Sequence, residues 1–327
     1  MLSTHLPQGE HRFAERGAES AAPLGAAVWI DLLDPTAEET ALVERTLGVE
    51  LPTRKEAQEI EVSSRLYVEN GTVFMTATVP VGSDSPHPLT TPVTFVYQRQ
   101  RLVTSRFATP TPFETFAAKL ERSPVGYPTA QKVLMGLVDE LIDRLADILE
   151  AVAAELAEFS SVVFPPGAPA GGRRAAVDYT ALLTRVGRTG ERAAHARESL
   201  VSLGRVVTFF QESLHSAAGG EPLDEHWRTV AKDIAALTEH TNFVSGKVNF
   251  FLDATLGRIN IEQNTIIKLF SVLAVVFLPP TLIASIYGMN FLHMPELAWP
   301  FGYPFSLALM VAAAILPYVV FKRRGWL

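Results

Sequence analysis

The sequence predicts a cytosolic α/β domain followed by a helical layer, one long stalk helix and two C-terminal transmembrane helices. Strand-like alternation of apolar and polar residues ends before Thr111, and no proline interrupts the chain between Pro222 and Pro279. Two stretches near the C-terminus, Leu269 to Phe291 and Leu297 to Phe321, contain no charged residue. Each is longer than the roughly 20 residues that cross a hydrocarbon core. Runs of this length disfavour the alternative of two buried core helices.

The charges that flank these two spans predict their orientation. Lys268 lies at the start of the first span, and Lys322, Arg323 and Arg324 follow the second, whereas the loop between the spans carries only Glu296. Because basic flanks stay in the cytoplasm, both termini are expected to be cytoplasmic. The first 25 residues contain no apolar signal segment. We therefore expect a multi-pass protein of the cell inner (plasma) membrane whose large N-terminal part is cytosolic.

The composition excludes several classes of function. The net charge is −7, and because the residues from 266 onward carry net +3, the preceding 265 residues carry −10. Such an acidic domain is a poor partner for nucleic acid and a plausible attractor of cations. The absence of cysteine rules out disulfides and thiolate metal sites. No phosphate-binding loop, zinc motif or catalytic triad is present, so we expect neither an enzyme nor an organic cofactor.

Local signals place the elements of the α/β domain. Ala27 to Leu33 is typical of a buried strand, and Thr36 and Gly48 are suited to cap the helix between them. Asn70 and Gly71 predict a tight hairpin. A second hairpin is expected between Val93 to Tyr97 and Leu102 to Phe107. The complete division is an unassigned tail 1–25, an α/β domain 26–125, a helical layer 126–222 with a break at 165–172, a stalk helix 223–265, a first span 266–291, an external loop 292–300, a second span 301–321 and a basic cytosolic tail 322–327.

The stalk helix is predicted to continue into the first span. A continuous helix from Asp224 to Tyr287 holds about 64 residues and is roughly 96 Å long at 1.5 Å per residue. No compact domain buries a helix of that length. We therefore expect it to reach from the cytosolic domain to the outer face of the membrane, packed against other helices or against copies of itself.

Five short segments in and around the two spans carry a family resemblance. Phe277 to Thr281 (Phe-Leu-Pro-Pro-Thr) precedes Tyr287 to Asn290 (Tyr-Gly-Met-Asn), and Met294 to Leu297, Gly302 to Pro304 and Lys322 to Leu327 follow. Together they closely resemble the membrane region of the CorA family of divalent-cation channels, in its magnesium branch. In the rest of the chain only the order of the elements is similar to that family.

The resemblance implies a funnel-shaped homopentamer in the lipid bilayer. Five first spans would line one pore, five second spans would surround it, and Gly288, Met289 and Asn290 would form the selectivity filter. Because Mg²⁺ gives up its water reluctantly and prefers oxygen ligands, a ring of neutral Asn290 amides suits the hydrated ion. Gly288 is expected to adopt a positive φ, and Met289 to pack. Mg²⁺ is thus implied as the transported ion, with Co²⁺ and Ni²⁺ as further divalent candidates.

The pore face can be derived from the helical period alone. At 100° per residue, seven side chains fall within roughly 100° of one another, and they include every Ser and Thr of the span. This stripe mixes polar with apolar positions, as expected of a path with hydrophobic gates. The alternative is that the hydroxyls bond to their own helix or pack between helices. The predicted pore-lining residues are Asn264, Ile267, Ser271, Ala274, Leu278, Thr281 and Ser285.

Regulatory Mg²⁺ sites between cytosolic domains are also implied by the resemblance. Asp84 lies in the loop where the family places one carboxylate, and Asp224, Asp233 and Asp253 on the stalk are candidates for its partner. For each of them a solvated charged face is the alternative. For Glu296 two roles are open, the attraction of cations and the capping of a helix.

Two other functions remain open. A zinc transporter of the related branch would share the fold, although Met289 and the run Met294 to Leu297 favour magnesium. A membrane-anchored helical adaptor would require sustained heptads with flanking charges. Such heptads are not evident between Asp224 and Asn264.

Overall fold

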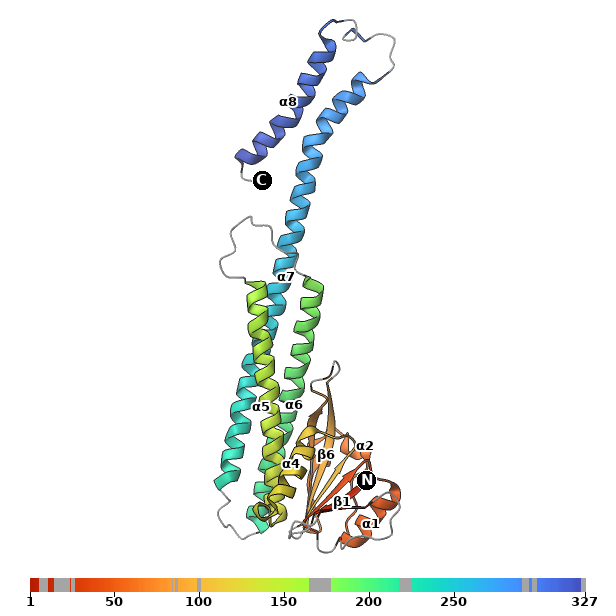
Figure 1. The fold of residues 1–327 in the computed structure, drawn as a ribbon, viewed down its shortest axis with the longest axis vertical. Coiled ribbons are helices and arrows are strands. Elements are labelled where there is room, and N and C mark those ends of the chain that lie inside the picture. The colour runs from red at the N-terminus through yellow and green to blue at the C-terminus, as the bar shows by residue number, and fades with distance from the viewer. Residues whose placement is uncertain are drawn as a thin grey trace. The chain divides into compact units, whose positions relative to one another are not determined.

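A computed structural model describes residues 1–5, 11–14, 24, 27–83, 85, 88–98, 101–164, 178–217, 225–289, 294–295 and 299–324. The chain divides into two compact units, Met1–Leu252 and Asp253–Leu327. Figure 1 shows the fold, with a sheet and long helices in the first unit and two helices in the second. Each unit is described separately.

One sheet forms the α/β part of the first unit. Within the described residues its strand order is β2-β1-β3-β7-β6-β5-β4. The pairing of β3 with β7 is parallel and the other pairings are antiparallel. The strands are β1 (Leu2–His5), β2 (His11–Ala14), β3 (Trp29–Leu33), β4 (Leu66–Glu69), β5 (Thr72–Val81), β6 (Leu89–Gln98) and β7 (Arg101–Arg106).

The cap and turn predictions in this domain are confirmed. The Oγ of Thr36 accepts a hydrogen bond from the backbone of Glu39 at 3.2 Å, and the Glu39 carboxylate accepts one from the backbone of Thr36 at 2.9 Å. This capping box starts α1 (Ala37–Leu47), which ends at Gly48 with a φ of 64°. Asn70 and Gly71 have φ angles of 49° and 77°. Both angles fit the hairpin turn between β4 and β5.

The N-terminal segment contributes two strands that the sequence analysis did not assign. β1 lies between β2 and β3, and the side chain of Leu2 is buried in the core beneath the sheet. Strands of four residues carry too little alternation to be recognised from sequence. Here β1 pairs with the edge of β3, and β2 pairs in turn with β1.

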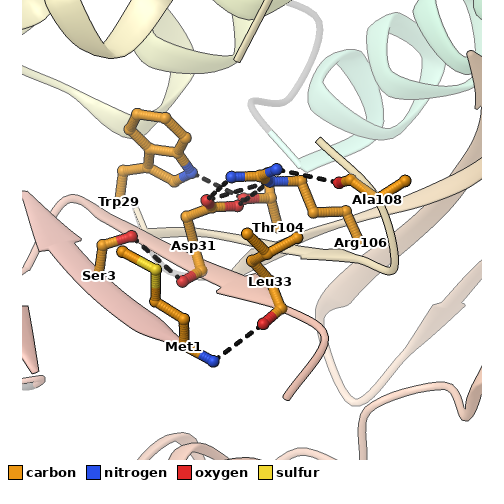
Figure 2. Close-up of polar contacts among 8 residues, drawn as sticks. All are labelled: Met1, Ser3, Trp29, Asp31, Leu33, Thr104, Arg106 and Ala108. Carbon is orange, nitrogen blue, oxygen red and sulfur yellow. Dashed lines mark hydrogen bonds and ion pairs between the residues drawn. The ribbon is translucent and has the colours of Figure 1, made fainter. Parts of the chain in front are cut away.

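A buried ion pair joins the two parallel strands at the centre of the sheet (Figure 2). The guanidinium of Arg106 on β7 donates to both carboxylate oxygens of Asp31 on β3, with the Nη2–Oδ2 distance 2.7 Å. Thr104 donates its hydroxyl to Asp31 at 2.6 Å and accepts from the indole of Trp29 at 2.9 Å. Arg106 also donates to the carbonyl of Ala108 at 3.0 Å. The pair is thus hydrogen-bonded on several sides, as a buried charge requires.

Long helices form a second layer of the first unit, which packs against the sheet. In Figure 1, α5, α6 and the beginning of α7 lie side by side. Almost all of the described residues between 130 and 217 are helical, as expected of the predicted helical layer, whereas the predicted break at 165–172 lies outside the described residues. The remaining helices are α2 (Arg54–Ala57), α3 (Val62–Arg65), α4 (Thr111–Arg122), the short 3-10 helix η2 (Pro124–Gly126), α5 (Ala130–Val163), α6 (Tyr179–Ala217), α7 (Glu225–Tyr287) and α8 (Gly302–Arg323).

The first part of α7 packs through a row of buried side chains spaced three or four residues apart, with one gap of seven residues between Ile234 and Thr241. Trp227 contacts Phe210 of α6 with ring centroids 5.3 Å apart, and Phe251 contacts Phe159 of α5 at 6.4 Å. This is the spacing of a coiled-coil seam, which the sequence analysis did not find. The seam includes a polar position at Thr241, which weakens the apolar pattern. Its buried members in the first unit are Trp227, Val230, Ile234, Thr241, Val244, Val248 and Phe251.

The second unit consists of the remainder of α7 and of α8. The predicted continuity of stalk and first span is confirmed, since α7 is one helix of 63 residues from Glu225 to Tyr287. Pro279 and Pro280 lie inside α7, and Pro317 lies inside α8. Such prolines are tolerated in spanning helices more than in soluble ones.

The buried ion pair predicts a large loss of stability when one partner is removed. Asp31→Ala leaves Arg106 buried without its counter-charge, and we expect the free energy of unfolding to fall by about 3 kcal/mol. The measurement is urea unfolding of the full chain in detergent, followed by tryptophan fluorescence.

The matched control removes an exposed ion pair. Arg185 of α6 lies 2.5 Å from Glu158 of α5, and about half of each side chain is exposed. We expect Arg185→Met to cost less than about 1 kcal/mol. Equal losses in the two variants would contradict the role assigned to Asp31.

Candidate functional site

The apolar parts of α7 and α8 are left almost entirely uncovered by the residues that the structure describes. In the most apolar stretch of α7 no residue is buried, and in that of α8 only 6% are buried. Large side chains such as Phe270, Leu278 and Leu316 are each more than 60% exposed. A core helix of a soluble protein would be buried, so these two helices fit a lipid or subunit environment. Both are long enough to cross a membrane.

The predicted pore-lining residues all lie within α7 and are solvent-exposed in the single chain. Because α7 is a continuous helix, the stripe keeps the regular 100° spacing from which it was derived. No side chain of the described residues covers it. The stripe is therefore an uncovered face that begins at Asn264 and reaches Ser285, two residues before the end of the helix.

Two hydroxyls of the stripe bond to their own helix. Thr281 donates to the carbonyl of Phe277 at 2.7 Å, and Ser285 donates to the carbonyl of Thr281 at 2.8 Å. This is the alternative that the sequence left open for these side chains. In each of these bonds the hydroxyl hydrogen is donated to the helix, and the lone pairs of the hydroxyl oxygen remain available to accept a hydrogen bond. Both residues retain the capacity to hold a water molecule or a hydrated cation.

The expectation of a positive φ at Gly288 is wrong. The glycines with positive φ in the described residues are Gly48, Gly71 and Gly82. Gly288 instead continues the helical hydrogen bonding, because its N–H donates to the carbonyl of Ala284 at 2.9 Å. A Cβ at this position would come within 3.1 Å of that oxygen, which is tight. The glycine therefore provides space beside the last turn rather than a left-handed exit.

The rest of the predicted filter is only partly described. Met289 follows the end of α7 and is 46% exposed, without a core to pack into in the single chain. Asn290 and the loop residue Glu296 lie outside the described residues. The triplet thus begins one residue after Tyr287, where the helix ends.

Of the four predicted regulatory carboxylates, the two that the structure describes do not lie together. Asp84 and Asp224 lie outside the described residues, and Asp233 and Asp253 are both exposed on α7. Twenty residues of helix separate the latter two by about 30 Å. Among the described residues, no group of three His, Asp or Glu side chains is placed to hold a metal ion. Any site that includes them needs ligands from elsewhere.

Two backbone oxygens were missed by the sequence analysis. Pro279 and Pro280 have no N–H, so the carbonyls of Val275 and Val276 lose their usual partners four residues on. Oxygen atoms of this kind suit hard cations and water. The signal for these oxygens is the pair of prolines in the sequence, because each proline leaves one backbone carbonyl without its usual donor.

Comparison with known proteins assigns the family. A family model described as CorA-like Mg²⁺ transporter protein matches residues 25–323. The chain is 34% identical over 317 residues to the magnesium transport protein CorA of Escherichia coli (strain K12), which covers 97% of each chain.

Solved structures support the same fold. The CorA magnesium transporter from Methanocaldococcus jannaschii matches with a TM-score of 0.72 at 18% identity, over 100% of this chain and 99% of that one. The full-length CmaX protein matches with a TM-score of 0.66 at 16% identity, over 99% and 97% of the two chains. Since the family model and the sequence relatives both span nearly the whole length, the chain belongs to the family of CorA-like Mg²⁺ transporters.

Proposed function

We propose that this protein is a pentameric Mg²⁺ channel whose pore is lined by α7 and whose filter is Gly288, Met289 and Asn290. The observation that carries the proposal is the uncovered stripe on α7, which leads to this triplet at the end of the helix. Membership of a family of Mg²⁺ transporters supports magnesium as the cargo. Co²⁺ and Ni²⁺ carry the same charge and are further candidates for transport.

An oligomer follows from the number of spans. Two helices cannot enclose a pore, so several copies have to contribute their α7 stripes to one path. The exposed apolar side chains on the other faces of α7 and α8 then contact neighbouring copies and lipid. Five copies, as the family resemblance implies, place the first spans around the pore and the second spans outside them.

The filter chemistry suits a hydrated divalent ion. Five neutral Asn290 amides would hold Mg²⁺ through its first-shell waters, because this ion loses water reluctantly. A ring of carboxylates would bind more tightly and release the ion more slowly. Below the filter, Thr281 and Asn264 provide polar steps, and Ile267 and Leu278 provide apolar constrictions that gate by dewetting.

The alternatives are less well supported. The curated relatives at 34% identity are named magnesium transport proteins, which favours magnesium over zinc. The adaptor alternative required a free coiled-coil face, but the buried seam on α7 contacts α5 and α6 of the same chain. It is therefore not available to a partner.

The charges that flank the two spans also support a proposed location of the protein in the cell inner membrane. With both termini in the cytoplasm of a cell inner membrane, the acidic first unit faces the cytosol and the loop with Glu296 faces outward. The net charge of −10 on the residues before the first span raises the local concentration of cations near the inner end of the pore.

We infer that cytosolic Mg²⁺ closes the channel by offsetting repulsion between carboxylates of neighbouring copies. Carboxylates that lie close together on α5 already repel one another within one chain. The pKa of Asp143 on α5 is raised by burial and then by the charges of Glu140 and Asp139, with Asp147 adding to it and Lys119 opposing it. Asp84, Asp224, Asp233 and Asp253 remain the proposed ligands between copies. Removal of Mg²⁺ would loosen the cytosolic domains and open the pore.

The filter proposal predicts loss of transport without loss of assembly. Asn290→Ala removes the amide oxygens, and we expect Mg²⁺ uptake into proteoliposomes to fall at least ten-fold while the oligomer stays intact on size-exclusion chromatography. Asn290→Asp should also lower uptake but keep the site's affinity for cations, because like charges in a ring trap an ion or raise one another's pKa.

The matched control is Asn249→Ala, an exposed asparagine on the cytosolic part of α7. Its uptake should equal that of the unmodified protein. Normal, cation-selective flux through assembled Asn290→Ala would show that the filter lies elsewhere on the path.

The feedback proposal predicts a Mg²⁺-dependent rate of proteolysis. We expect trypsin to cleave the cytosolic part of α7 several-fold faster in chelator than in millimolar Mg²⁺, because the domains separate when the ion is removed. Cleavage products identified by mass spectrometry locate the cut. Equal rates under the two conditions would argue against closure by cytosolic Mg²⁺.

The raised pKa of Asp143 predicts a pH-dependent effect on stability. A carboxyl whose pKa is raised in the fold is destabilising when ionised, so Asp143→Asn should stabilise the protein at pH 7 by about 0.5 kcal/mol, a value limited by solvent screening. The gain should disappear as the pH falls through the raised pKa towards the unfolded value of about 3.9. Thermal unfolding across pH, with Glu150→Gln on the same helix as the control, measures it. A gain that persists in acid would exclude the electrostatic cause.

A further inference from the structure

A cleft of about 600 Å³ lies in the first unit, where the sheet edge meets α6. It forms because β4 is short. The first residue of β4, Leu66, pairs with Met75, so β5 from Thr76 onward has no strand on that side among the described residues. Instead α6 faces this edge, and the backbone N–H of Thr78 donates to the hydroxyl of Ser202 at 2.8 Å.

Three arginines line the cleft, against a single acidic residue, Glu198. Arg197 and Arg205 lie on the same face of α6, eight residues apart, and both are exposed. Within the described part of the chain neither of them has a hydrogen-bond or ion-pair partner. The cleft is thus locally cationic in a domain that is strongly acidic overall. Exposed guanidinium groups without a protein partner bind phosphate and carboxylate oxygens, often through two hydrogen bonds at once.

The third arginine is held in place. Arg65 is half-buried, and its Nη1 donates to the hydroxyl of Thr78 at 3.0 Å while its Nε donates to the carbonyl of Glu59. Both partners are neutral, so the positive charge is not cancelled. Because its geometry is fixed before any ligand arrives, Arg65 loses little side-chain entropy on binding.

The mouth of the cleft also exposes aliphatic surface. Ile60 is 89% exposed, Val62 is 47% exposed and Val201 is 37% exposed, and all three line the same space. The volume falls in the range of small-molecule sites and is far larger than one phosphate ion. Apolar surface beside unpaired arginines suits a ligand with an anionic end and an apolar, planar body.

We propose that this cleft binds a nucleotide, with the phosphates held by Arg197, Arg205 and Arg65 and the base covering Ile60, Val62 and Val201. The site is distinct from the pore and from the carboxylates considered for Mg²⁺. A carboxylate from a second copy of the chain shares the charge but does not fill a cavity of about 600 Å³ or cover its apolar mouth. The cytosolic orientation proposed for the first unit places the cleft where nucleotides are abundant.

The test is isothermal titration of the full chain in detergent with ATP, and separately with inorganic phosphate, at a fixed free Mg²⁺ concentration. We expect ATP to bind and phosphate to bind at least ten-fold more weakly. The double variant Arg197→Gln/Arg205→Gln should lower ATP affinity by about a hundred-fold, since each charged hydrogen bond contributes about ten-fold. Affinity should also fall as salt is raised.

The control is Arg188→Gln, an exposed arginine of α6 that does not line the cleft. It should bind ATP normally, and circular dichroism should show that all variants remain folded. Absence of ATP binding at millimolar concentration would overturn the proposal, as would equal losses in Arg188→Gln. Phosphate binding as tight as ATP would overturn the nucleotide assignment. A double variant that loses its oligomeric state, with no ATP binding in the unmodified protein, would identify the cleft as a contact between copies instead.

Discussion

One helix, α7, has to satisfy two different environments along a single backbone. Its first part buries a narrow seam against α5 and α6, so its outer faces can remain polar. Its later part is mostly apolar, and none of the described residues buries its most apolar stretch. The change of pattern occurs without a break in the helix, which extends 63 residues. The proposed channel depends on this continuity, because it would make the packing surface of the first unit and the proposed pore face parts of one element.

Local chemistry explains why most of the fold could be predicted. Thr36, Gly48 and Asn70 each fix a helix end or a turn through their own backbone preferences or hydrogen bonds, and each is found as expected. The two spans were evident because lipid imposes length and apolarity directly on the sequence. In contrast, β1 and β2 could not be predicted, since four-residue strands depend on distant pairing partners, which are β3 for β1 and β1 for β2.

The candidate site, too, could be predicted from the sequence only in part. The helical period alone yields the stripe from Asn264 to Ser285, because a continuous helix preserves it. The conformation of Gly288 was predicted wrongly, since glycine permits a positive φ without requiring it. The seam on α7 was missed because Thr241 interrupts its apolar character while remaining fully buried. The proposed sites between carboxylates of separate copies would be a property of an assembly, and the pattern of one chain does not pair the carboxylates.

The prolines inside the spans have a mechanical consequence. Bending a helix stretches the hydrogen bonds on its outer side, and most turns resist this with a full set of bonds. The turn before Pro279 and Pro280 lacks two of them, and the turn before Pro317 in α8 lacks one. Each apolar helix therefore has a point of low bending stiffness at a defined position along its length. Flexure concentrates at these turns, while the segments on either side move as rigid rods.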